Sequence, residues 1–139
     1  MSKKEAAKAA RTVNAALETA SRQDANTIGE CLSHIYDYSK DRFNYATLLS
    51  IYARDDSDEA KEELKRASEE AWYYLLNALD HVERLDAITL KTTGEKFSWF
   101  VYDVRDIRDA TEEERAVLHS TCGDQLIDFV EAMAKSSGR

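Results

Sequence analysis

SDEAKEELKRASEEAWYYLLNALDHVERLDA, residues 57–87, is the stretch around which the rest of the chain is expected to pack. Its first half is rich in charged residues, whereas its second half carries apolar residues around more than half of a helical circumference. One continuous helical stripe is formed by Leu64, Ala67, Ala71, Tyr74, Leu75, Ala78, Val82 and Leu85. Trp72, Leu76 and Leu79 widen this stripe on a second flank. We therefore predict a central helix that its neighbours cover from two sides.

Composition indicates a helical protein with a core of its own. The chain has 139 residues, of which 43% are hydrophobic and 33% are charged, so one domain without disulfides is expected. The absence of proline and the presence of only four glycines favour long helices. No stretch has the roughly 18 apolar residues that a membrane span requires. A soluble, cytoplasmic protein without membrane contacts is expected, with Cys31 and Cys122 as reduced thiols.

The net charge of -8 is distributed unevenly along the chain. Residues 55–70 contain eight acidic and three basic residues, whereas residues 1–11 contain four basic residues and one acidic residue. Because no basic stripe could neutralise several phosphates, direct nucleic-acid binding is not expected. An acidic mimic that occupies a nucleic-acid-binding groove is one alternative function.

The first helix is predicted over residues 3–22. Its buried edge, spaced by three and four residues, consists of Ala6, Ala10, Val13, Leu17 and Ala20. Such small side chains favour close approach to a neighbouring helix.

The second helix is predicted over residues 27–54, starting at a capping box formed by Thr27 and Glu30. Its side chains follow a heptad repeat, with Ile28, Ile35, Arg42 and Leu49 at a positions and Cys31, Tyr38, Tyr45 and Tyr52 at d positions. This pattern is typical of packing within a bundle, and self-association through the same seam is an alternative.

Residues 88–104 change the period from helical to alternating. In residues 88–93, Ile88, Leu90 and Thr92 alternate with Thr89, Lys91 and Thr93. In residues 97–102, Phe97, Trp99 and Val101 alternate with Ser98, Phe100 and Tyr102, and Gly94 lies between the two runs. We predict a β-hairpin here, with a helix over residues 97–108 as the alternative.

A last helix is predicted over residues 111–136, beginning at a capping box of Thr111 and Glu114. The expected fold is thus a mainly α, single-domain bundle of about four helices, with a small hairpin before the last.

Two Cys/His pairs form the one candidate zinc set. Cys31 and His34 are three residues apart, as are His119 and Cys122, and four such ligands would suit tetrahedral zinc. Both cysteines lie within apolar stripes, where cysteine behaves as a small hydrophobic residue. The default prediction is therefore no metal and no cofactor.

Arg42 is unusual because it occupies an a position of the heptad. A guanidinium that faces a core needs a carboxylate, because an unpaired buried charge is unfavourable. The central helix offers Glu69, Glu70, Asp80 and Glu83 as partners. In the alternative interpretation Arg42 extends to the surface and only its stem is covered.

No catalytic motif is present, so we expect a binding protein and not an enzyme. By size, charge and lack of motifs alone it is comparable to immunity proteins, antitoxins and phage-encoded anti-defence inhibitors, which act by protein–protein interaction. The expected surface for a basic protein partner comprises Asp55, Asp56, Asp58, Glu59, Glu62, Glu63, Tyr73, Phe100 and Tyr102. The alternative from another class is a helical-bundle, metal-dependent hydrolase that uses the Cys/His set or the carboxylates Glu62, Glu63, Asp80 and Glu83.

Overall fold

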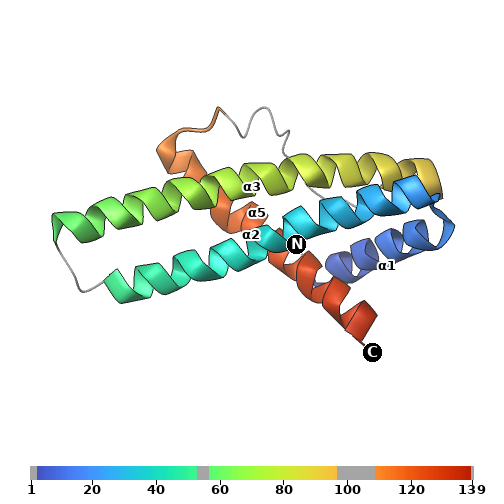
Figure 1. Ribbon diagram of the computed structural model, residues 1–139, viewed down its shortest axis with the longest axis horizontal. Helices are drawn as coiled ribbons and strands as arrows, with labels where there is room; N and C mark the ends of the chain where they lie inside the picture. Colours follow the sequence, from blue (N-terminus) through green and yellow to red (C-terminus); the bar gives the residue numbers. More distant parts are fainter. Residues whose placement is uncertain (1–2, 53–56, 97–108, 139) are drawn as a thin grey trace.

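The structure is a computed structural model that describes residues 3–52, 57–96 and 109–138 (Figure 1). The described residues form four helices: α1 (Lys3–Thr19), α2 (Arg22–Tyr52), α3 (Asp58–Thr93) and α5 (Glu112–Gly138). No strand occurs among them, so the prediction of a mainly α fold is confirmed and that of a β-hairpin is not. No helix in these ranges is both long enough and apolar enough to cross a membrane.

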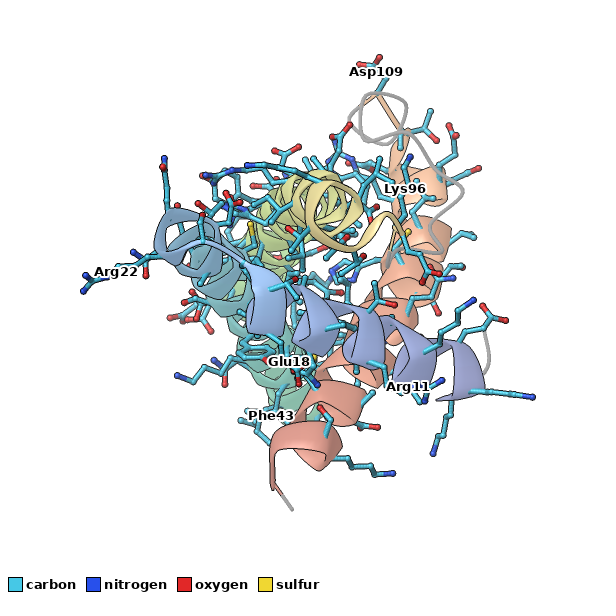
Figure 2. All side chains as sticks on the ribbon, turned by 90° about the vertical axis from the view of Figure 1, so that its right-hand side faces the viewer. Arg11, Glu18, Arg22, Phe43, Lys96 and Asp109 are labelled. Atoms are coloured by element: carbon cyan, nitrogen blue, oxygen red, sulfur yellow. The ribbon has the colours of Figure 1, made fainter. Side chains whose placement is uncertain are left out.

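The two longest helices, α2 and α3, run antiparallel and form one layer (Figure 1). Helices α1 and α5 lie on the same face of this layer, as the view along the long axis shows (Figure 2). Helix α5 crosses the layer obliquely near its middle, so the end of the layer that holds the C-terminus of α2 and the N-terminus of α3 extends beyond both covering helices (Figure 1).

The core lies where α1 and α5 cover the α2–α3 layer. Its largest fully buried side chains include Tyr38, Phe129, Ile28, Ile35, Leu75, Leu85 and Leu126. Helix α3 supplies the second half of the predicted central stripe to this core, whereas Tyr74 is 38% exposed. In α1 the small residues Ala6, Ala10 and Val13 are buried as expected, whereas Leu17 is exposed.

Residues 88–93, predicted as the first strand of the hairpin, are the last turns of α3. The buried Thr89 continues the apolar stripe one turn beyond Leu85, so the helical period extends further than the apolar residues indicate. The hydroxyl of Thr93 donates a hydrogen bond to the carbonyl of Thr89 at 2.7 Å, so this polar group has a partner within the helix. The helix ends at Gly94, which has φ 80° and donates its N–H to the carbonyl of Leu90. The second predicted strand, from residue 97 onward, lies outside the described residues.

The start of α2 also differs from the prediction. The side chain of Ser21 accepts a hydrogen bond from the backbone N–H of Asp24 at 3.1 Å, and the helix begins at Arg22. Thr27 lies inside the helix, where its hydroxyl donates to the carbonyl of Gln23. The spacing of Thr27 and Glu30 matches that of a capping box, but these residues lie inside the helix, so the predicted cap is wrong.

The starts of α3 and α5 are each capped by a side chain, and at α5 this is the predicted capping box. The hydroxyl of Ser57 accepts from the N–H of Ala60 at 3.1 Å at the start of α3. At the start of α5, Thr111 and Glu114 form the reciprocal capping box, with the N–H of Glu114 donating to the hydroxyl of Thr111. Both helices therefore begin where a side-chain acceptor replaces a missing backbone partner.

Candidate functional site

The end of the α2–α3 layer is a two-helix arm, defined here as residues 41–52 of α2 and 58–70 of α3. Large apolar side chains of α2 are exposed in it: Phe43 at 72%, Ile51 at 62% and Leu49 at 42% (Figure 2 labels Phe43). Leu49 occupies a heptad a position, as do the buried Ile28 and Ile35. The heptad seam thus continues along α2 beyond the point where α1 and α5 cover it.

The acidic side of the arm belongs to the first turns of α3. Asp58, Glu59 and Glu62 are exposed and Glu63 is half-buried. Residues 58–70 contain six acidic and three basic residues, so this part of α3 carries a net charge of -3. The structure thus places an acidic helix beside the exposed apolar side chains of α2. The predicted partner residues Asp55 and Asp56 lie outside the described residues.

Asp41 contributes a second, less exposed negative charge to the arm. Its Oδ2 atom is buried and has no hydrogen-bond partner among the described residues. Burial raises the pKa of this carboxyl, and the negative charge of Glu70 raises it further. A cation placed beside Asp41 would therefore relieve both effects.

Tyr73 is an exposed aromatic residue just beyond the arm. It is 67% exposed and makes an edge contact with Tyr74, with ring centroids 6.0 Å apart. Phe100 and Tyr102, the other two predicted partner-binding aromatics, lie outside the described residues. Trp72, which was expected to extend the apolar stripe, is buried.

A cavity of about 480 Å³ lies between α3 and α5, next to the arm. It is lined by Lys65, Ser68, Glu69, Trp72, Glu112, Arg115 and His119. The guanidinium of Arg115 lies over the ring of Trp72, 5.2 Å from its centroid. Nε1 of Trp72 and Nε of Arg115 are buried N–H donors without an acceptor among the described residues. Two buried donors thus belong to residues that line the cavity.

A polar network behind this cavity joins α2 to α5. The hydroxyl of Tyr38 lies 3.1 Å from Nδ1 of His119, and Nη2 of Arg42 pairs with Oδ1 of Asp124 at 2.6 Å. The partner of Arg42 is thus a carboxylate of the last helix and none of the four on the central helix. The side chain of Arg42 is 28% exposed, so it lies at the margin of the core.

Burial changes the acid–base behaviour of this network. It raises the pKa of the Tyr38 hydroxyl above its usual range and that of the Cys122 thiol to about 11. Burial also lowers the pKa of His119, and the nearby charge of Arg42 acts in the same direction. These groups are therefore held neutral, and they do not resemble an activated nucleophile with its base.

His119 provides a prediction on pH. Because its pKa is lowered in the folded protein, the unfolded chain binds the proton more readily, and stability should fall as the pH drops below the ordinary value of 6.5. The contribution is at most about 1.4 kcal/mol for each pH unit. Urea denaturation between pH 7 and pH 5 should therefore show a smaller loss of stability in His119→Gln than in the wild type. Equal slopes would contradict the assignment of a neutral, buried imidazole.

The predicted Cys/His set is not assembled into one site. Cys31 and Cys122 are both buried free thiols. His119 contacts Tyr38, whereas His34 stacks on His81 of α3 with ring centroids 3.9 Å apart. The pairing of His34 with His81 was missed, because it depends on the register between two helices.

The carboxylates of the hydrolase alternative are also far apart. Glu63 and Asp80 lie on the same continuous helix α3 and are separated by 17 residues. At about 1.5 Å per residue this places them roughly 25 Å apart, so they cannot hold one ion.

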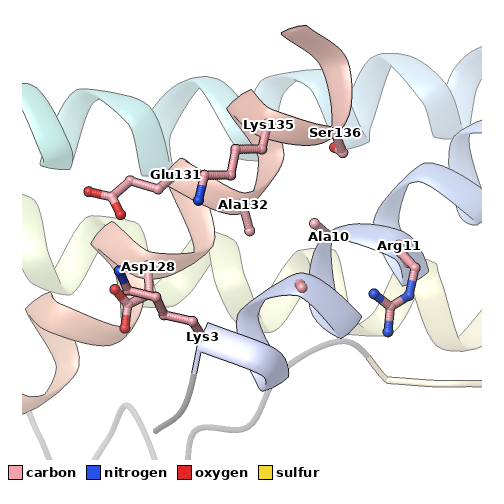
Figure 3. A pocket seen from close by; sticks show the side chains of 9 residues that line it. Lys3, Ala10, Arg11, Asp128, Glu131, Ala132, Lys135 and Ser136 are labelled. Carbon is pink, nitrogen blue, oxygen red and sulfur yellow. The ribbon is translucent and has the colours of Figure 1, made fainter. Parts of the chain in front are cut away.

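A second cavity, of about 290 Å³, lies between α1 and α5 (Figure 3). Its charged lining residues are Lys3, Arg11, Asp128, Glu131 and Lys135. These residues lie away from the arm and carry both signs of charge.

Comparison of the chain with protein-family models, with curated proteins and with solved structures gives no match.

Proposed function

We propose that the protein is an acidic binding protein that docks on a basic surface of another protein through its two-helix arm. The observation that carries this proposal is the exposure of Phe43 and Ile51, which lie about 80° apart around α2, in the part of the layer that also holds the acidic start of α3. An apolar centre with a charged rim is the usual composition of a protein interface. No catalytic step is part of this function.

The charges of the arm support a cationic partner. The side chains of Asp58, Glu59 and Glu62 are exposed and would attract lysine or arginine from a distance. A lysine or arginine that reached Oδ2 of Asp41 would supply the hydrogen-bond donor that this buried atom lacks. Exposed charges increase the rate of association, whereas a buried pair of this kind lengthens the lifetime of the complex.

The cavity beside the arm supports an anchored mode of docking. Trp72 and Arg115 belong to the residue types that most often dominate interface energetics. Their buried N–H groups would donate to a carbonyl or carboxylate oxygen of the partner. In this mode an acidic helix attracts the partner and the cavity receives one of its side chains.

Inhibition of the partner is the role proposed for the complex. A chain of 139 residues that covers a basic surface excludes other ligands from it, as immunity proteins, antitoxins and anti-defence inhibitors do. This part of the proposal rests on size, charge and the absence of catalytic motifs.

Affinity capture from a lysate of the native host tests the proposal. The wild type is expected to recover one stoichiometric protein at low salt, with a slower association rate as salt is raised. The double variant Phe43→Ser, Ile51→Ser should weaken this complex by at least about 30-fold, as expected for residues at the centre of an interface. The variant Asp41→Asn should weaken it less.

Two matched variants control for surface and charge. Leu90→Ser removes an apolar side chain that is 44% exposed at the opposite end of α3, and Asp128→Asn removes a carboxylate on α5. Both should capture the partner as the wild type does. Unchanged capture by the arm variant, with circular dichroism showing all variants folded, would refute docking through the arm.

A further inference from the structure

Glu30, His34 and His81 form a cluster of metal-ligand side chains outside the arm. One ligand atom from each residue lies within 4.8 Å of the other two. Glu30 and His34 are four residues apart and therefore share one face of α2, and His81 lies opposite them on α3. No other group of three or more histidine, cysteine, aspartate or glutamate side chains in the described ranges is so close.

The cluster extends from the margin of the core, where His34 and His81 lie about 40° around their helices from the buried Tyr38 and Leu85, to solvent at Glu30. Glu30 is exposed and both histidines are half-buried. On the helical wheel Glu30 lies roughly opposite the buried Ile28, and Arg84 lies roughly opposite the buried Val82. An ion could therefore reach the cluster from solvent without any rearrangement of the core.

Asn77 orients both imidazole rings. Nδ1 of His81 lies 2.8 Å from the backbone carbonyl of Asn77, and because a carbonyl only accepts, Nδ1 carries the proton. Nε2 of His81 is thereby left with a free lone pair, as metal-binding histidines require. Nδ1 of His34 lies 3.2 Å from the amide nitrogen Nδ2 of Asn77, an orientation in which Nδ1 accepts the hydrogen bond. Metal binding requires the amide to turn by 180°, so that its oxygen accepts from Nδ1–H and Nε2 of His34 is free in the same way.

We propose that Glu30, His34 and His81 bind one divalent first-row transition-metal ion of the zinc type. Two imidazole nitrogens and one carboxylate oxygen suit such an ion and leave its remaining positions to water. Bonds of about 2.0–2.2 Å place tetrahedral ligands about 3.3 Å apart, whereas the ligand atoms now lie within 4.8 Å of one another. Metal binding must therefore draw these atoms together and unstack the two rings, whose planes are 22° apart, so that both lone pairs meet at the ion. The bound ion ties α2 to α3.

Arg84 competes with the metal for Glu30. Its Nη1 lies 3.6 Å from Oε1 of Glu30, and both side chains are more than half exposed. The guanidinium neutralises the carboxylate in the absence of metal and must release it when an ion binds. Removing this cation should therefore strengthen metal binding, an effect that a purely structural ion pair would not produce.

Titration of the metal-free full-length protein with Zn²⁺ and Co²⁺ tests the site. One ion per chain is expected, with a melting temperature that rises as the metal concentration is raised. His34→Gln and His81→Gln should each weaken the affinity by at least about 100-fold. Arg84→Gln, which leaves all three ligands in place, should tighten it by roughly two- to fivefold.

A matched pair of carboxylate variants separates ligation from general charge. Glu30→Gln should weaken binding by at least about tenfold, whereas Glu83→Gln makes the same change at an exposed neighbour of Arg84 and should leave the affinity unchanged. The Co²⁺ complex should lack a thiolate charge-transfer band, because Cys31 and Cys122 are not ligands. Absence of binding, equal affinity in Glu30→Gln and Glu83→Gln, or a thiolate band would each overturn the proposal. The site does not depend on the arm, so either proposal can fail without the other.

Discussion

Replacing Leu75 with alanine is expected to lower the free energy of unfolding by about 2–5 kcal/mol. Leu75 has no exposed surface and lies in the middle of α3, where α1, α2 and α5 meet in one cluster of buried side chains. Close packing on all sides prevents the cavity left by alanine from collapsing. Because domains of this size are stable by about 5–15 kcal/mol, the loss is a large share of the total.

Leu90→Ala is the matched control for this prediction. It makes the same chemical change in the same helix at a side chain that is 44% exposed, so a loss of less than about 1 kcal/mol is expected. Urea denaturation followed by circular dichroism measures both values. Similar losses for the two variants would show that α3 is not the centre of the core.

The same substitution at two helical glycines should have opposite effects. Gly29→Ala in α2 should stabilise the protein by about 0.5–1 kcal/mol, because alanine favours the helix and nothing lies within 4 Å of the added carbon. Gly123→Ala in α5 gains the same propensity, but the added carbon would clash with the hydroxyl of Tyr38 and lie 2.9 Å from Nη1 of Arg42. Overpacking of this kind costs about 1–3 kcal/mol, so a net loss is expected.

Tyr38→Phe shows whether the clash is the cause. Tyr38 is fully buried and its hydroxyl contacts His119, so it cannot move aside without losing that contact. In the Tyr38→Phe background, Gly123→Ala should therefore be less destabilising, which gives a favourable coupling energy in a double-mutant cycle. Chemical denaturation of the four proteins measures it. Additive effects would locate the strain elsewhere.

The helical fold was largely predictable because it depends on local patterns. The central stripe of α3, the heptads in the first half of α2 and the caps at Ser57 and Thr111 all lie within one helix and are visible along the chain. The error at residues 88–93 arose because Thr89 is polar, so its burial concealed the helical period and left only an apparent alternation. The break before α2 was misplaced because Ser21 and Thr27 are both good capping residues.

The candidate sites were less predictable because they depend on contacts between helices. The acidity of residues 58–70 could be recognised from the chain alone. Leu49 is exposed, although Ile28 and Ile35 of the same heptad seam are buried. This difference follows from where α5 crosses the layer. The approach of His34 to His81 and of Arg42 to Asp124 is likewise set by the register of neighbouring helices.

Hydrogen exchange of the free and partner-bound protein tests the central claim, docking through the arm, most directly. In the free protein α5 contacts only the base of the arm, at Arg42 and at the cavity, so the amides farther out should exchange by local opening faster than those of the core. In the complex recovered by capture, we predict slower exchange confined to the arm, residues 41–52 and 58–70, and to the lining of the cavity. Protection of α1 or of the C-terminal half of α5, with exchange in the arm unchanged, would contradict the account.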